Sequence, residues 1–128
     1  MIHIVIVDDE ADTHLLYKLK FKKLFASIGE LNLVSFLSAP ETLDYLNKPT
    51  TPPVDLILSD INMPDMDGFE LLQELRKNHS KIPVYMVSAY ESPEYRMKAA
   101  SLGAARFLSK PVDFHTLIEM IKKDLQLG

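Results

Sequence analysis

The sequence predicts an α/β domain in which five strands alternate with five helices. Three observations support this fold class. Short β-branched or apolar runs recur along the chain, each run ends in turn chemistry, and a segment with helical spacing of apolar residues follows each one. Strict alternation of strands and helices is typical of a parallel sheet with helices on both faces.

The first strand and helix occupy the N-terminal part of the chain. A strand is predicted at residues 2–7, which are β-branched almost throughout, and a helix at residues 11–28, which ends at Gly29. Leu15 and Leu19 lie roughly opposite the apolar stripe of this helix, so they either face a partner or pack against the last helix. The stripe consists of Tyr17, Phe21, Leu24 and Ile28.

The second strand is predicted to have one exposed face. Residues 31–37 alternate apolar and polar side chains, which is typical of a strand near the edge of a sheet. Ser38 then caps a short helix that ends near Asn47, and Glu41 stands three positions after the cap, as in a capping box. A stiff loop with three prolines, residues 48–53, leads to the next strand.

The third strand lies in the middle of the chain. The apolar run at residues 54–60 predicts a buried strand, and it stops at a carboxylate, Asp60, which Met-Pro-Asp and Asp-Gly turn chemistry follows. A charge at the end of a buried strand is costly unless it meets a cation or solvent. Asp67, with Glu70 three positions on, caps the next helix.

Two further strands and helices complete the pattern. The strands are predicted at residues 82–87 and 104–109. Ser92 and Pro93 begin a helix of about ten residues after the former strand, and Asp113 caps the final helix after the latter. The core stripe of the final helix consists of Phe114, Leu117, Ile118, Ile121 and Leu125.

Length and composition favour one soluble domain spanning residues 1–128. A chain of 128 residues needs no disulfide or structural metal to fold. It contains no cysteine, no apolar run near the ~20 residues of a membrane span and no signal-peptide pattern at its start. The net charge of −4 argues against direct nucleic-acid binding. We therefore expect a cytoplasmic domain that binds neither membranes nor nucleic acids.

Polar side chains stand where the predicted strands end. These are Asp8 and Asp9 after the first strand, Asp60 at the end of the third, Ser88 after the fourth and Lys110 after the fifth. The carboxyl ends of parallel strands share one edge of the sheet, where ligands bind. Two carboxylates ~4 Å apart repel by about 4 kcal/mol at an effective dielectric of about 20, so three of them need a cation. Oxygen ligands favour Mg²⁺ over zinc.

Other metal and phosphate sites fit the sequence less well. The four histidines are scattered and cysteine is absent, so a zinc site lacks ligands. A calcium loop would need an acidic residue where Met63 stands, and a phosphatase with an aspartate nucleophile would need a second acid in place of Asn62. Asp65, Asp67 and Glu70 are better explained as turn and cap residues than as metal ligands.

Four separated motifs resemble those of the receiver domain of two-component response regulators, and they lie in the same order along the chain. They are Val7-Asp8-Asp9-Glu10, the stretch from Ser59 to Gly68, Val87-Ser88-Ala89 and Ser109-Lys110-Pro111. The resemblance spans residues 2–127. It implies a doubly wound (βα)5 three-layer sandwich of the flavodoxin-like kind, with a five-stranded parallel sheet of order 2-1-3-4-5.

The resemblance also implies a phosphorylation and metal site. Asp60 would be the phosphoacceptor, forming an acyl phosphate, and Lys110 would contact a phosphoryl oxygen. Mg²⁺ would be the cofactor, bound by Asp9, Asp60 and the backbone carbonyl of Asn62, with Asp8 holding a metal-bound water. The peptide bond that follows Lys110 is expected to be cis, since a proline comes next.

A conformational switch is implied as well. Ser88 would turn to hydrogen-bond the phosphoryl group, and Phe107 would move inward into the vacated space. Asn62 and Tyr90 would flank the phosphate and tune its hydrolysis. Two positions depart from the common family pattern. Serine stands where threonine is also common, and phenylalanine replaces tyrosine, so any signal at Phe107 must depend on packing rather than on a phenolic hydrogen bond.

The implied function is that of a signalling switch and not of a turnover enzyme, although it would assist its own phosphorylation and slow dephosphorylation. The phosphodonor would be a histidine kinase or a histidine phosphotransfer protein, contacting the first helix near Asp12, Thr13 and Leu16. The output would be a downstream protein or a fused output domain. Two alternatives stay open: the chain is a receiver-like interaction scaffold that acts without phosphorylation, or Asp8 and Asp9 merely cap the first helix.

Overall fold

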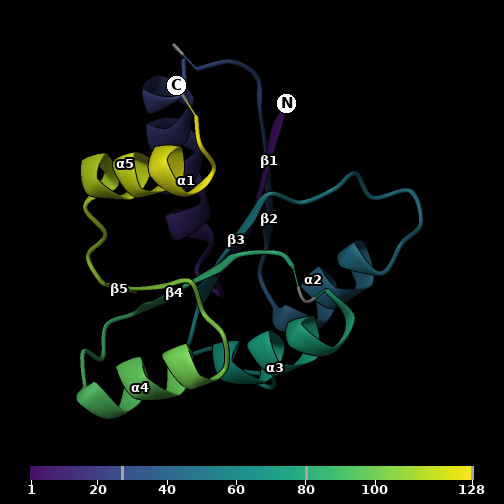
Figure 1. The fold of residues 1–128 in the computed structure, drawn as a ribbon, viewed down its shortest axis with the longest axis vertical. Helices are drawn as coiled ribbons and strands as arrows, with labels where there is room; N and C mark the ends of the chain where they lie inside the picture. The colour runs from purple at the N-terminus through teal and green to yellow at the C-terminus, as the bar shows by residue number, and fades with distance from the viewer. Residues whose placement is uncertain (27, 80, 128) are drawn as a thin grey trace.

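Five parallel strands form one sheet in the order β2-β1-β3-β4-β5 (Figure 1). The structure is a computed structural model that describes residues 1–26, 28–79 and 81–127. The alternating strands and helices confirm the predicted fold class, and the strand order confirms the topology that the resemblance implied. The elements are β1 (Ile2–Val7), α1 (Ala11–Leu24), β2 (Leu31–Phe36), α2 (Ala39–Leu46), β3 (Leu56–Asp60), α3 (Gly68–Asn78), β4 (Val84–Ser88), α4 (Pro93–Ser101), β5 (Arg106–Ser109) and α5 (Phe114–Asp124).

Helices cover both faces of the sheet. Helices α1 and α5 lie on one face, and α2, α3 and α4 lie on the other (Figure 1). Successive side chains of β1 point to opposite faces. Ile4 and Ile6 therefore belong to the core beneath α1 and α5, whereas Val5 and Val7 belong to the core on the other face. Apart from His3, the strand is apolar because both of its faces are buried.

The first helix is shorter than its apolar spacing predicted. It ends at Leu24, and Phe25 caps it through a backbone N–H bond to the carbonyl of Phe21. Phe25 and Ile28 still pack against the core beneath α1, although they lie beyond the helix. The apolar spacing therefore predicted correctly that these side chains pack on the core, but they lie in a turn and not in the helix. Residue 27 of the predicted helix lies outside the described residues.

The predicted helix caps are confirmed. Asp67 and Glu70 form a reciprocal capping box at the start of α3, and the side chains of Ser38, Ser92 and Asp113 each accept the backbone N–H three positions on. These caps satisfy amide groups that have no partner inside the helix.

Gly68 allows α3 to start directly against the end of β3. A Cβ atom at Gly68 would lie 2.8 Å from the Cα of Ile61, well inside van der Waals contact. A glycine is therefore needed where the helix approaches the strand end that carries Asp60.

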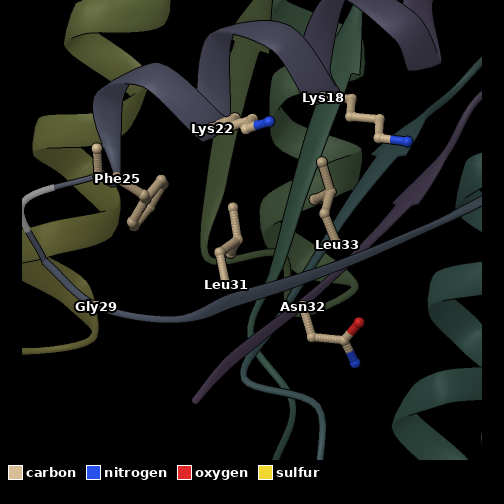
Figure 2. Close-up of a pocket in the computed structure, with 8 residues that line it drawn as sticks. Lys18, Lys22, Phe25, Gly29, Leu31, Asn32 and Leu33 are labelled. Atoms are coloured by element: carbon tan, nitrogen blue, oxygen red, sulfur yellow. The ribbon is translucent and has the colours of Figure 1, made fainter.

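Strand β2 forms one edge of the sheet, as its alternating pattern predicted. The predicted exposed face is wrong, because the side chains of β2 are half-buried on both faces except at Ser35. Leu31 and Leu33 point toward α1, whereas Asn32 points away from it (Figure 2). On α1 itself, Leu15 and Leu19 are each 59% exposed, so the alternative that they pack against α5 is wrong. Among the described residues, no helix is both long and apolar enough to span a membrane.

Candidate functional site

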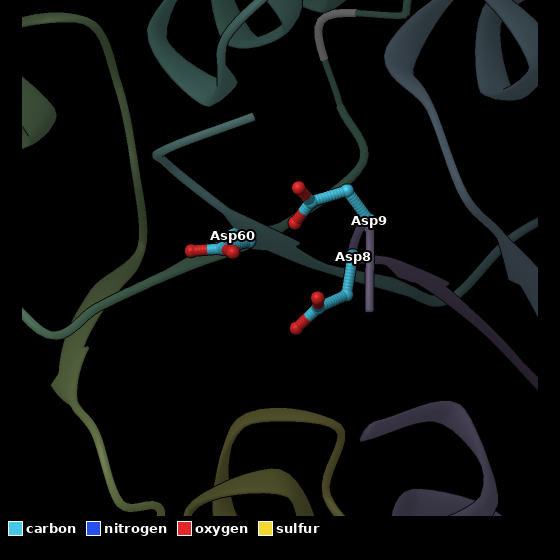
Figure 3. A group of neighbouring side chains, drawn as sticks. All are labelled: Asp8, Asp9 and Asp60. Atoms are coloured by element: carbon cyan, nitrogen blue, oxygen red, sulfur yellow. The ribbon is translucent and has the colours of Figure 1, made fainter. Parts of the chain in front are cut away.

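The polar residues expected at the carboxyl edge of the sheet lie there together. Asp60 is the last residue of β3 and Ser88 is the last residue of β4, while Asp8 follows β1 and Lys110 follows β5. The carboxylates of Asp8, Asp9 and Asp60 face one another across the ends of β1 and β3 (Figure 3). The parallel register produces this grouping, because each strand delivers its last side chain to the same edge.

Lys110 is the cation of this group. Its Nζ atom lies 3.1 Å from Oδ2 of Asp60 and 3.4 Å from Oδ2 of Asp8. Asp8 and Asp60 are almost completely buried, whereas the Lys110 side chain keeps a quarter of its surface exposed. The peptide bond between Lys110 and Pro111 is cis, as the resemblance implied.

The electrostatics of the group are unbalanced. Burial raises the pKa of Asp60 above its ordinary value, and the charges of Asp8 and Asp9 raise it further, although Lys110 acts in the opposite direction. Burial would lower the pKa of Lys110, but Asp60 and Asp8 outweigh that effect and raise it. A buried carboxylate that binds protons more readily than in water is one that lacks sufficient positive charge.

The donor set fits a hard divalent cation. Asp8, Asp9 and Asp60 each offer a carboxylate oxygen within 4.8 Å of the other two, and oxygen ligands of this kind are those that Mg²⁺ prefers. Asp9 is the exposed member of the three. Asp8 is less available to a metal ion, because one of its oxygens accepts the N–H of Glu10 at 2.9 Å and the other pairs with Lys110.

The alternative that Asp8 or Asp9 caps α1 is wrong. The cap position is Glu10, and no side-chain hydrogen bond is made from it. The bond between Asp8 and the N–H of Glu10 instead holds the turn that separates β1 from the helix. Asp8 thus combines a turn contact with its place in the carboxylate group.

Ser88 is held by a chain of hydrogen bonds that reaches α4. Its Oγ donates to Oδ1 of Asn62 at 3.1 Å and accepts the N–H of Tyr90 at 3.0 Å. Asn62 in turn donates from Nδ2 to the hydroxyl of Tyr95 at 3.2 Å. Three of the residues expected around the site, Ser88, Asn62 and Tyr90, are therefore in direct contact, and Tyr95 extends the chain to the helix.

Phe107 lies further back on β5, opposite Met86 of β4. Its ring is half-buried, and the guanidinium of Arg96 lies 4.8 Å from the ring centre. Arg96 also pairs with Glu91 and donates to the hydroxyl of Ser109 at 3.4 Å. An arginine from α4 thus covers the aromatic residue that was expected to move.

Sequence reasoning missed three contributors to the site. Tyr95 and Arg96 approach from α4, where nothing in their spacing distinguishes them from surface residues. His14 lies one turn into α1, and its Nε2 is 2.6 Å from the backbone carbonyl of Asp8. A histidine so soon after two aspartates is a signal that could have suggested this contact.

Comparisons with known proteins agree with this geometry. A family profile described as "Response regulator receiver domain" matches residues 4–122. The response regulator protein PilR of Pseudomonas aeruginosa is 33% identical over 123 residues, which is 96% of this chain and 26% of PilR. The sensor protein EvgS of Escherichia coli is 32% identical over 89% of this chain and 9% of EvgS. This chain therefore spans about a quarter or less of these curated relatives.

Solved structures show the same fold. A CheY-like response regulator receiver domain protein from Methanospirillum hungatei superimposes with a TM-score of 0.85 at 29% identity, covering 98% of this chain and 94% of the other. The chemotaxis protein CheY4 of Vibrio cholerae gives a TM-score of 0.83 at 25% identity, covering 96% and 98%. Receiver domains are signalling modules of two-component systems rather than turnover enzymes on external substrates. The family match over most of the chain, together with the strand order and the acidic edge of the sheet, shows that this chain belongs to the response regulator receiver domain family.

Proposed function

We propose that this domain is a phosphoacceptor switch that receives a phosphoryl group on Asp60 from a histidine kinase or a histidine phosphotransfer protein. One observation carries the proposal: a buried carboxylate at the end of the central strand has a lysine Nζ at 3.1 Å and two further carboxylates beside it. A nucleophile, a cation for the transferred group and a set of oxygen ligands are thus assembled in one place.

The chemistry proposed for Asp60 is a simple displacement. An Oδ atom of Asp60 attacks phosphorus and forms an O–P bond, while the P–N bond of the donor phosphohistidine breaks and the imidazole nitrogen keeps the electron pair. Lys110 already contacts Oδ2 of Asp60, so its ammonium group can follow a phosphoryl oxygen that arrives on the same carboxylate.

The same residues fit the cofactor expected for the family. Asp9, Asp60 and the backbone carbonyl of Asn62 would hold Mg²⁺, and Asp8 would hold it through a water molecule. When bound, the ion would offset negative charge on the carboxylates and on the transferred group. Asp8 is suited to the indirect role because both of its oxygens already accept hydrogen bonds from the protein.

Ser88 supplies the proposed switch. In this structure its hydroxyl donates to Asn62, so it must release Asn62 before it can donate to a phosphoryl oxygen. Phosphorylation would therefore favour a second arrangement of Ser88, with Phe107 moving inward once Arg96 uncovers its ring. Asn62 and Tyr90, which both contact Ser88, are placed to tune the lifetime of the phosphoryl group.

A groove beside the site is suited to the phosphodonor. It has a volume of about 460 Å³ and runs between the start of α1 and the loop that follows β5. Its lining includes Thr13 and Leu16, which the resemblance placed in the kinase contact, together with Lys110 and Val112. We propose that the donor protein docks there, that a downstream protein or a fused domain provides the output, and that the domain acts in the cytoplasm.

Labelling with a small phosphodonor tests this function. Acetyl phosphate and Mg²⁺ should add one phosphoryl group to the protein, detected by intact-protein mass spectrometry. Asp60→Asn should abolish the labelling, because the amide cannot act as the nucleophile. Asp65→Asn is the matched control, since this aspartate lies in the exposed turn after β3 and should leave labelling unchanged. An unlabelled wild-type protein, or labelling that survives in Asp60→Asn, would favour the scaffold alternative.

A further inference from the structure

The second half of α1 is strongly basic, although the chain as a whole is acidic. Four of the six residues from 18 to 23 are lysines, whereas the net charge of the chain is −4. All four are exposed. None of the ion pairs found among the described residues involves any of them. The lysines are Lys18, Lys20, Lys22 and Lys23.

Two of these lysines share a face of the helix with the exposed leucines. Leu15, Lys18, Leu19 and Lys22 follow the i, i+3, i+4, i+7 spacing that places side chains on one side of a helix. This face is distinct from the side of α1 that borders the phosphorylation site, where Thr13 and Leu16 line the other groove. It is also distinct from the buried side, which carries Tyr17 and Phe21.

A groove runs between this face and the edge strand. It has a volume of about 390 Å³ and is lined by Lys18 and Lys22 from α1, with an apolar floor that includes Phe25, Leu31 and Leu33. In Figure 2 both leucines of β2 point up toward the helix that carries the lysines. Cations therefore stand over an apolar surface, a combination that suits a ligand with both carboxylates and apolar side chains.

The floor of the groove ends at an open edge of the sheet. Among the strands that the structure describes, β2 has β1 as its single neighbour. The carbonyls of Glu30 and Phe36 accept backbone N–H groups from the β1 side. Backbone groups alternate in direction along a strand, so those of Leu31, Leu33 and Ser35 point away from β1. An open edge of this kind is a template for one more strand.

We propose that the α1–β2 groove is a docking site for an acidic, extended segment of another protein, which adds to the free edge of β2. Its apolar side chains would pack on Leu31 and Leu33, and its carboxylates would pair with Lys18 and Lys22. Charge complementarity selects this partner, because within the described part of the chain these lysines form no ion pair with an acidic side chain, and they stand beside the open edge of β2. The site is separate from Asp60 and would give the domain a second contact besides its phosphodonor.

A synthetic peptide tests the proposal. An eight-residue peptide in which every second residue is valine or glutamate by turns, with threonine between them, should bind the full chain in 0.15 M salt, measured by fluorescence anisotropy. Its valines and glutamates then lie on the one face of the added strand that is turned toward α1. Lys18→Glu/Lys22→Glu should weaken binding at least about tenfold through charge reversal. Lys20→Glu/Lys23→Glu is the matched control on another side of the same helix, and it should weaken binding less than about threefold, because the Debye length is then ~8 Å.

Hydrogen exchange distinguishes strand addition from loose attachment. Bound peptide should slow the exchange of the amides of Leu31, Leu33 and Ser35, since these groups would become hydrogen-bonded. The proposal would be overturned if the two double variants lost peptide affinity equally, if the exchange of these amides stayed unchanged, or if the peptide did not bind at all. So would binding of phosphatidylglycerol vesicles, or self-association of the chain, through Lys18 and Lys22 in place of the peptide. Labelling of Asp60 by acetyl phosphate should be the same in Lys18→Glu/Lys22→Glu, so this test does not depend on the proposed phosphorylation.

Discussion

Two aspartates of the domain form ion pairs with basic residues from the β5 region, yet the pKa of one carboxyl is raised and that of the other is lowered. Asp60 pairs with Lys110 at 3.1 Å at the carboxyl edge of the sheet. Asp124, in the last turn of α5, pairs with Arg106 through two bonds of 2.7 and 2.8 Å, and it also accepts the hydroxyl of Tyr85. The first pair lies in the candidate site, and the second fastens a helix to the sheet.

The pKa values of the two carboxyls follow their surroundings. Burial and neighbouring carboxylates raise the pKa of Asp60. The side-chain hydrogen bonds from Arg106 lower the pKa of Asp124 to about 2, against a smaller opposing effect of burial. At the first position three carboxylates lie together and Lys110 pairs with two of them. At the second position Asp124 pairs with Arg106, and the charge of Lys123 lowers its pKa further.

The difference shows how this fold separates stability from function. The Asp124 pair is balanced, so it can stabilise the domain without further help. The group around Asp60 is left short of positive charge, so the folded domain gains from a bound cation. The carboxylate that folding leaves uncompensated is also the one that we propose as the phosphoacceptor.

Removing the two basic residues should produce the largest contrast. Lys110→Met should lower the free energy of unfolding by about 2 kcal/mol without Mg²⁺, less than the ~3–5 for a fully buried pair because Lys110 stays partly exposed. Arg106→Met should cost about 1 kcal/mol, since Asp124 retains contact with water. Urea unfolding followed by circular dichroism in EDTA measures both.

Two further measurements sharpen this result. Added Mg²⁺ should reduce the loss of unfolding free energy in Lys110→Met and leave that in Arg106→Met unchanged. The reason is that only Lys110→Met removes a positive charge from beside the three carboxylates. Lys122→Met, which removes the half-buried partner of the exposed Glu119 at 3.5 Å, is the control and should change stability little. Equal losses in the Lys110 and Arg106 variants would contradict the comparison.

Neutralising the two aspartates should act with opposite signs. Asp60→Asn should raise the free energy of unfolding by about 1 kcal/mol at pH 7 in EDTA, because it removes a buried negative charge that Asp8 and Asp9 repel. Asp124→Asn should lower it by about 1 kcal/mol, because it removes the charge and one of the two oxygens that accept the Arg106 bonds. Thermal and urea unfolding of both variants should agree on these signs; destabilisation by Asp60→Asn would show that Lys110 compensates the group fully.

The sequence predicted the carboxyl edge of the sheet well because its information is local. Each apolar run stops at or just before a polar residue of the candidate site. These residues could therefore be assigned before their neighbours in space were known; they are Asp8, Asp60, Ser88 and Lys110. Which strands are adjacent could not be derived in this way. Alternating strands and helices permit several orders, and the order 2-1-3-4-5 came from the family resemblance alone.

Contacts between distant segments were the main omission. Asn62 and Tyr95 are 33 positions apart, and no periodicity links them, although their hydrogen bond connects the site to α4. The balanced pair was missed for the same reason, because Arg106 and Asp124 meet only when α5 folds back across β5. The end of α1 was misplaced since Phe25 and Ile28 continue the apolar spacing beyond the last helical turn.

The smallest expected effect is the pH dependence of the Asp124 contribution, and its sign follows from the lowered pKa. The folded state holds the Asp124 carboxyl ionised down to about pH 2, whereas an ordinary aspartate takes up its proton near 3.8. The unfolded chain therefore binds more protons in this range, so the stabilisation is complete above about pH 5 and is lost as the pH falls toward 2. The difference in unfolding free energy between wild type and Asp124→Asn should accordingly stay constant from pH 7 to 5 and shrink below pH 4.

The difference between wild type and Asp60→Asn should have the opposite sign. Asp60→Asn should be more stable than wild type at pH 7, and this advantage should fade on acidification because protonation of Asp60 removes the same charge. Urea titrations at half-unit pH steps measure both differences, and a difference for Asp124→Asn that persists unchanged to pH 3 would show that packing rather than charge holds α5 to the sheet.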